Sequence, residues 1–414
     1  MGPLRHRNFR LLWTGMVLNG IANWVYQVTG GWLVYELTRS PLMLGLNSLF
    51  AAIPTIVISL YGGAVADRMD RRKLLLITQI LVVLLALIPA TFSALGIIQA
   101  WHIFALNLVI NTVTAFEGPA RQALVPLLVP RGELMRAVAL TSVIRRGTAL
   151  IGPLLGGAAI AVTGAAGSYF IQFLLLVVVL LNTLIMKAPT GELESRGVTV
   201  GRSILDGFKH IYNDPLLFAM FGIEAMTMTF AMYVQILPVF ARDVLNVGPT
   251  GLGFLYAAPG IGAILASAMM LTAGDVKAKG RFFVVTALAK PLAMAVFALS
   301  TSLPLSMVML GMVGFLDVAG NTVRTTMIQL CVAQKMLGRI MSMDLVIHRG
   351  LGTINGLPLG ALAALMGAPW GLAGGSIAVF IYIVLTLWRV PAVDRYRESP
   401  PLPTAAGTQP SGKG

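Results

Sequence analysis

Long apolar stretches follow one another along this sequence, and each could cross a lipid bilayer. A helix needs roughly 20 predominantly apolar residues to span the hydrocarbon core. Twelve such stretches cover residues 10–36, 41–66, 74–96, 101–128, 139–163, 168–188, 215–240, 251–273, 281–301, 304–330, 341–365 and 370–390. Backbone polar groups must be bonded internally in lipid, and helices achieve this within one segment. We therefore expect an all-α membrane protein with 12 transmembrane helices.

The composition agrees with a membrane protein. Of 414 residues, 57% are hydrophobic and only 11% are charged, which is too apolar for a soluble domain. The single cysteine, Cys331, allows neither an internal disulfide nor a thiolate metal site, so no metal is predicted. No phosphate-binding loop and no nucleophile–base pair with a supporting context is present, so we expect no cofactor, no ATP hydrolysis and no enzyme activity.

The positive charge has a regular distribution. The formal net charge of +14 would suit a nucleic acid partner, but the basic residues gather in alternate connections between apolar stretches. These connections cover residues 5–10, 68–73, 131–146, 187–209, 277–281, 335–339 and 389–397. The intervening connections hold little beyond Arg39 and Arg242. This asymmetry predicts cytoplasmic N- and C-termini and no nucleic acid partner. No cleavage site follows the basic N-terminus, so the first helix is expected to be retained.

The longest polar insertion divides the chain into halves. We expect an N-terminal six-helix bundle over residues 1–188, a cytoplasmic linker over 189–214, a C-terminal six-helix bundle over 215–390 and a disordered cytoplasmic tail over 391–414. Residues 203–212 in the linker are expected to form a short amphipathic helix.

The two halves are related by an internal repeat. Residues 121–136 align without a gap onto residues 324–339, so that Arg121 meets Arg324 and Arg136 meets Arg339. Farther on, Gly147 meets Gly350. Because each half has an even number of spans, the repeats share one orientation, an arrangement found in transporters whose site lies between two bundles.

A basic motif lies between the second and third apolar stretches. Residues 62–73 resemble the cytoplasmic loop signature of the major facilitator superfamily, except that Asp70 replaces the usual glycine. The resemblance implies a breakable charge latch on the cytoplasmic side. The expected latch residues are Gly63, Asp67, Arg68, Arg71, Arg72, Arg121 and Arg324. The alternative is that the basic residues only determine topology.

A glycine motif lies in the fifth apolar stretch. Gly147, Gly152, Pro153, Gly156 and Gly157 resemble the antiporter motif of the same superfamily, with a first spacing one residue longer than usual. The resemblance implies export rather than import. The alternative is helix packing alone, because glycine and proline are common in membrane helices.

Three further segments narrow the resemblance to one branch. Residues 116–126, 4–13 and 30–41 are similar to the macrolide-efflux and enterobactin-exporter group, the transmembrane secretion effectors. The resemblance covers most of the chain and implies two pseudo-symmetric six-helix bundles of the major facilitator fold.

Several ionisable residues fall inside apolar stretches. Such a group costs at least ~2.5–3.5 kcal/mol at the bilayer centre, which makes it a functional candidate. We expect Glu117, Glu224 and Asp317 to take part in proton coupling. The alternative is a set of structural ion pairs, Glu117 with Arg121 and Asp317 with Arg324. Lys290 precedes Pro291 and could simply bond to a carbonyl freed by that proline.

Polar and methionine side chains suggest the walls of a cavity. Asn19, Asn23 and Gln27 are spaced by four residues and share one helix face, which we expect to line the cavity. Met228 and Tyr233, within a methionine-rich segment, could form an adaptable apolar wall, although packing is the alternative. Further polar candidates are Asn47, Asn107, Asn111 and Gln235.

These observations together predict a transporter. We expect a monomeric secondary-active exporter in the bacterial inner membrane, driven by the proton gradient, for a small amphipathic or hydrophobic molecule of the drug or siderophore type. Drug resistance is one expected phenotype. The alternatives are an importer or lipid flippase of the same fold, and a non-transporting membrane receptor or assembly protein.

Overall fold

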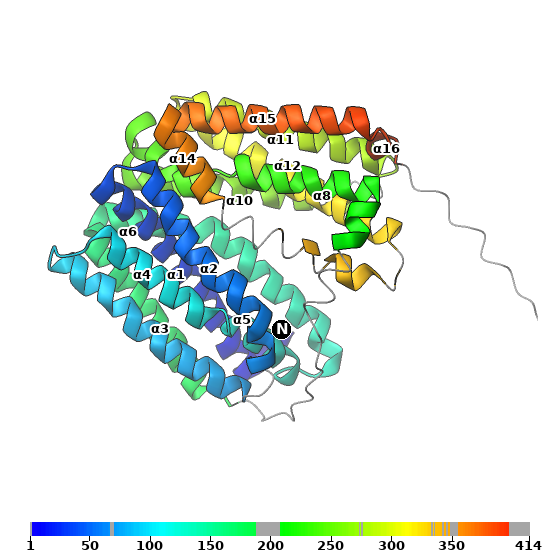
Figure 1. Cartoon of the computed structure of the whole chain (residues 1–414). Helices are drawn as coiled ribbons and strands as arrows, with labels where there is room; N and C mark the ends of the chain where they lie inside the picture. Colours follow the sequence, from blue (N-terminus) through cyan, green and yellow to red (C-terminus); the bar gives the residue numbers. More distant parts are fainter. Residues whose placement is uncertain are drawn as a thin grey trace, which may run out of the picture.

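The computed structural model describes residues 2–66, 70–187, 208–272, 274, 276–332, 334, 336–341, 343–344, 347 and 355–396 (Figure 1). For residues 55–66, 119, 123 and 145 it describes the backbone alone. All elements of this described part are helical, which confirms the predicted all-α class.

The first half contains six helices in the described ranges. Their bounds are Arg7–Thr38 (α1), Pro41–Ala66 (α2), Arg71–Ala94 (α3), Ala100–Thr114 (α4), Glu117–Leu124 (α5) and Leu134–Ile185 (α6). Three short 3-10 helices accompany them, Pro3–Arg5 (η1), Val125–Leu127 (η2) and Arg131–Glu133 (η3). The long α6 is interrupted at Gly164, where φ is +68°, and it covers two of the predicted stretches. Glycine adopts this left-handed conformation without the steric cost of a side chain.

The second half contains further helices. Their bounds are Pro215–Phe230 (α8), Leu237–Val239 (α9), Gly248–Thr272 (α10), Lys279–Leu299 (α11), Leu303–Cys331 (α12), Gly356–Met366 (α14), Ala368–Arg389 (α15) and Ala392–Arg395 (α16). A 3-10 helix, Val234–Ile236 (η4), and a π-helix, Phe240–Val244 (η5), flank α9.

The described helices identify a multi-pass membrane protein. Seven segments are long and apolar enough to cross a membrane: Arg71–Ala94, Arg131–Ile185, Pro215–Val244, Gly248–Thr272, Lys279–Leu299, Leu303–Cys331 and Ala368–Arg389. The predicted stretch 341–365 lies only partly within the described residues, where α14 occupies its end. Residues 208–213 are helical, while the rest of the predicted linker helix and residues 397–414 of the tail lie outside the described part.

The helices form two groups that follow the order of the sequence. Figure 1 shows α1–α6, in blue to green-cyan, in one group and α8–α16, in green to red, in the other. The groups meet where α6 packs on α10 and where α2 packs on α14. These two contacts join the halves that the internal repeat relates.

Candidate transport site

A cavity of about 510 Å³ lies mainly among the helices of the first half. Its wall comes from α1, α2, α3, α4, α5 and α6, with η4 and α10 contributing from the second half. Eight carboxamide side chains line it: Asn19, Asn23, Gln27, Asn47, Asn107, Asn111, Gln172 and Gln235. This volume is within the usual range for a small-molecule site.

The amide face predicted from the first apolar stretch lies on this cavity. Asn19, Asn23 and Gln27 all line it because residues four apart share one side of α1. On the same cavity, the Asn107 side chain of α4 donates a 2.6 Å hydrogen bond to the Asn47 Oδ1 atom of α2. Sequence reasoning missed Gln172, although a glutamine within the apolar run of α6 was a usable signal.

A charged pair also lines the cavity. Arg121 donates a hydrogen bond to Glu117 one turn earlier in α5, and both side chains are largely buried. The structure thus contains the ion pair that was the structural alternative, and it places that pair on the wall of the cavity.

The predicted methionine wall is not among the described residues that line the cavity. Met228 is buried in α8, and its carbonyl accepts a hydrogen bond from Asn355. Tyr233 is buried as well, with its ring edge-on to Phe297. Both side chains are thus buried and away from the described wall of this cavity.

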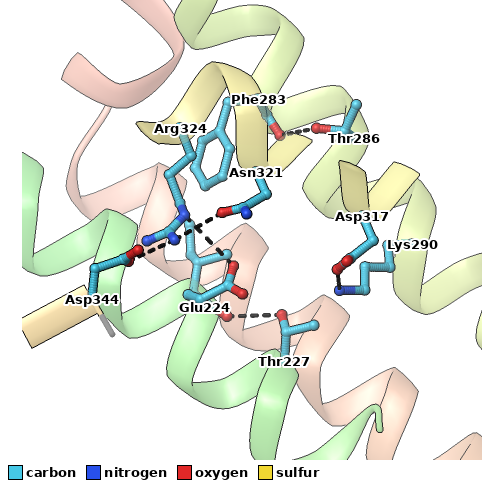
Figure 2. Close-up of polar contacts among 10 residues, drawn as sticks. Glu224, Thr227, Phe283, Thr286, Lys290, Asp317, Asn321, Arg324 and Asp344 are labelled. Atoms are coloured by element: carbon cyan, nitrogen blue, oxygen red, sulfur yellow. Dashed lines mark hydrogen bonds and ion pairs between the residues drawn. The ribbon is translucent and has the colours of Figure 1, made fainter. Parts of the chain in front are cut away.

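The second half contains a buried cluster of charges around Arg324 (Figure 2). The Arg324 side chain has no exposed surface. Its Nη2 atom donates to Asp344 at 2.7 Å and to Asn321 at 3.0 Å, and its Nε atom is 3.8 Å from a Glu224 carboxylate oxygen. The guanidinium also lies 5.7 Å from the centre of the Phe221 ring. These contacts offset part of the large cost of burying the cation.

A second ion pair lies beside this cluster. Lys290 of α11 donates to Asp317 of α12, and both line a small cavity that Glu224 also reaches (Figure 2). The predicted alternative pairing of Asp317 with Arg324 is wrong, because α11 brings Lys290 to Asp317. Lys290 therefore has a carboxylate partner rather than only a carbonyl beside Pro291.

The glycine motif of α6 packs against two different helices. A methyl group at Gly152 would lie 2.6 Å from Trp24 of α1, and one at Gly157 would lie 2.5 Å from the carbonyl oxygen of Pro249, in the first turn of α10. Gly156 faces Val25 and Val28 of α1. In contrast, no heavy atom of the described residues is found within 4 Å of a methyl group at Gly147. The motif, which includes Pro153, therefore contributes to close packing within the first half and between the halves.

Sequence reasoning missed a charge cluster that joins the two halves at the end of α1. The Arg242 Nη1 atom of η5 lies 3.3 Å from Glu36, and the Arg39 Nη1 atom lies 3.7 Å from Asp243. Tyr35 also donates to Asp243. The two arginines were visible as exceptions to the charge asymmetry, but their partners depend on how the halves pack.

The predicted cytoplasmic latch centres on the connection between α2 and α3. Asp67 and Arg68 lie outside the described residues, and Gly63 lies in the part of α2 that is described by its backbone alone. Arg71 begins α3, and the Arg72 guanidinium donates to the Leu184 carbonyl at the end of α6.

Asp70, the residue that departs from the loop signature, caps α3. Its side chain accepts a 2.8 Å hydrogen bond from the Lys73 backbone. This interaction satisfies an otherwise unpaired N–H group in the first turn of the helix.

The sequence matches a known family over nearly its whole length. The family model described as transmembrane secretion effector matches residues 1–406. Enterobactin exporter EntS of Escherichia coli O6:K15:H31 (strain 536 / UPEC) is 27% identical, and the alignment covers 91% of this chain and 90% of the relative. Enterobactin exporter EntS of Shigella boydii serotype 18 (strain CDC 3083-94 / BS512) is also 27% identical, with 90% and 89% covered.

Solved structures share the fold at lower identity. The nucleoside transporter NupG superposes with a TM-score of 0.69 at 15% identity, covering 94% of this chain and 100% of that chain. A bacterial homologue of the human lysosomal transporter Spinster, in an inward-facing and occupied conformation, gives a TM-score of 0.70 at 14% identity, with 97% and 100% covered. These structural similarities support the predicted helical transporter fold.

Proposed function

Because the chain belongs to the transmembrane secretion effector family of the major facilitator superfamily, we propose that it is a proton-coupled exporter of small amphipathic molecules. The family and the relatives are membrane transporters, so the chain is a multi-pass transporter and not an enzyme. The names of the relatives and the glycine motif favour export, with a siderophore-type or drug-type molecule as cargo.

The observation that carries this proposal is a polar cavity between helices of a membrane transporter. Eight carboxamides and the Glu117–Arg121 pair line a space large enough for a small molecule. Polar groups of this kind have a cost in a membrane protein and usually mark a substrate pathway. The cavity reaches η4 and α10, so a bound molecule could contact both halves.

Alternating access is the proposed transport mechanism. The Arg242–Glu36 and Arg39–Asp243 pairs link the halves near the end of α1, which the charge asymmetry places on the side of the membrane opposite the cytoplasm. We propose that these pairs hold the outer end together in this state and separate when cargo is released. The two halves, residues 1–188 and 215–390, would rock about the α2–α14 and α6–α10 contacts.

Proton coupling is assigned to the carboxylates Glu224 and Asp317 of the second half. Glu224 lies near both Arg324 and Lys290, and Asp317 is bonded to Lys290. Protonating a carboxylate in such surroundings changes which cation it holds, and that change can bias which side of the transporter is open. Glu117 at the cavity is a second candidate.

We further propose a monomer in the bacterial inner membrane, with 12 transmembrane helices in two six-helix bundles and both termini cytoplasmic. Asp67 and Arg68 remain part of the proposed cytoplasmic latch. Arg121 and Arg324 are proposed to contribute positive charges to the same latch. An importer or lipid flippase, or a non-transporting receptor, is the competing function.

Accumulation assays in an efflux-deficient bacterial host test this function. Cells expressing the unmodified chain should accumulate less chloramphenicol or enterobactin than cells expressing Glu224→Gln, and a protonophore should remove the difference. Greater accumulation in cells expressing the unmodified chain would support an importer. Equal accumulation of both compounds, with both proteins present in the membrane, would support the receptor alternative.

A further inference from the structure

Three polar atoms on the cavity residues have no hydrogen-bond partner within the described part of the chain. They are the Tyr26 hydroxyl and one amide oxygen each of Gln172 and Gln235. The Tyr26 and Gln172 residues are only 8% and 4% exposed. A buried polar group without a partner costs free energy, so each of these atoms favours a bound group that can complete its hydrogen bonds.

The three side chains come from different parts of the molecule. Tyr26 lies on α1 and Gln172 on the second part of α6, whereas Gln235 lies on η4 in the second half. All three line the same cavity. A molecule bonded to all of them would therefore bridge the two halves, and its binding would depend on how the halves are placed.

The charge on the cavity wall is balanced. Glu117 and Arg121 are the charged residues on the described wall, and they are bonded to each other. The wall thus carries no net charge to compensate a buried ligand ion, which loses its hydration on entering. Carboxamides supply both donors and acceptors, so this wall matches neutral groups such as amides and hydroxyls.

We propose that the cavity selects an uncharged molecule with several amide or hydroxyl groups, which bonds to Tyr26, Gln172 and Gln235, and that it discriminates against hydrophobic cations. This inference rests on the proposed transport function and defines the substrate class of the same site.

Equilibrium binding to the purified full chain in detergent tests the selection. The probes are chloramphenicol, an uncharged amide with two hydroxyl groups, and tetraphenylphosphonium, an apolar monocation. Titration calorimetry should give a dissociation constant for chloramphenicol at least about tenfold lower than that for tetraphenylphosphonium. Equal or tighter binding of the cation, or no binding of chloramphenicol at millimolar concentration, overturns the proposal.

Substitutions at the three residues test the assigned contacts. Gln172→Leu, Gln235→Leu and Tyr26→Phe should each weaken chloramphenicol binding by about five- to tenfold, the usual effect of one lost hydrogen bond. Gln79→Leu is the matched control, because Gln79 is also buried with an unpartnered amide oxygen but is not among the residues that line the cavity. Equal binding by all four variants overturns the assignment. Thermal unfolding of each variant verifies that it is folded.

The same proteins separate this inference from the transport function. In proteoliposomes with an imposed proton gradient, chloramphenicol should move only when the gradient is present. If binding follows the expected pattern but the gradient drives no movement, the coupled-transport proposal fails and the selection remains. If the gradient drives movement while the three substitutions leave binding unchanged, the inference fails and the function remains.

Discussion

The two halves use polar residues in opposite ways. In the first half, neutral amides surround a cavity of about 510 Å³, and the Glu117–Arg121 pair lies on its wall. In the second half, charged side chains are packed against one another around the fully buried Arg324, beside a cavity of about 30 Å³. The proposed function therefore assigns most of the binding surface to the first half and proton coupling to the second half.

The internal repeat makes this comparison direct. Arg121 and Arg324 occupy matching positions, yet Arg121 bonds to Glu117 of its own helix, whereas Arg324 bonds to Asn321 of its own helix and also to Asp344 outside it. Equivalent sequence positions have thus acquired different environments. The environment, rather than the residue type, determines whether each arginine contacts a cavity or supports a packed interior.

Replacing the two matching arginines should have the largest effects on stability, and the two losses should differ clearly. Arg324→Leu removes the cation bonded to Asp344 in a buried site, so we expect a loss of roughly 3–5 kcal/mol in stability. Arg121→Leu should cost less than Arg324→Leu, because Glu117 lines the large cavity, where water can reach the unpaired carboxylate. Thermal unfolding in detergent measures both. Equal losses would mean that the two environments are equivalent.

A bulky residue at the contact between the halves should have the next largest effect. Gly157→Leu would bring its Cβ atom against the carbonyl oxygen of Pro249, so overpacking should cost about 1–3 kcal/mol and reduce transport. Gly147→Leu is the control, since the described part of the chain places nothing within 4 Å of a Cβ atom at Gly147. Unfolding and proteoliposome transport should be unchanged for the control. If both variants behave alike, close approach at Gly157 is unimportant.

Neutralising a carboxylate in the second half should separate binding from coupling. Asp317→Asn removes the charge bonded to Lys290, so we expect gradient-driven transport to fall at least tenfold, about 1.4 kcal/mol. Chloramphenicol binding should remain within about twofold, because Asp317 is absent from the described wall of the large cavity. Titration calorimetry and proteoliposome transport measure the two quantities. A parallel loss of both would contradict the division between the halves.

The outer charge cluster should contribute least to stability. Glu36 and Arg242 are partly exposed, so a double-mutant cycle with Glu36→Ala and Arg242→Ala should give a coupling free energy of about 0.2–1 kcal/mol. The cycle is measured by thermal unfolding, and high salt should reduce the coupling. A coupling free energy of zero at low salt would show that this pair does not help to hold the halves together.

The sequence by itself determined the class of fold and one wall of the site. Apolar segment length is set by bilayer thickness, so the all-α membrane class followed from counting residues. Helical periodicity placed Asn19, Asn23 and Gln27 on one face, which requires only the geometry of a single helix. The loop and glycine motifs indicated the superfamily, and the family match bears this out.

Only the tertiary structure decided which residues meet across helices. The Lys290–Asp317, Arg324–Asp344 and Arg242–Glu36 contacts each join residues from different elements, so no periodicity within one helix could predict them. The same reason explains Met228 and Tyr233, whose apolar character suits a cavity wall and a packed interior equally well. Which surroundings a side chain receives depends on how helices far apart in sequence pack, and that arrangement is a property of the folded chain.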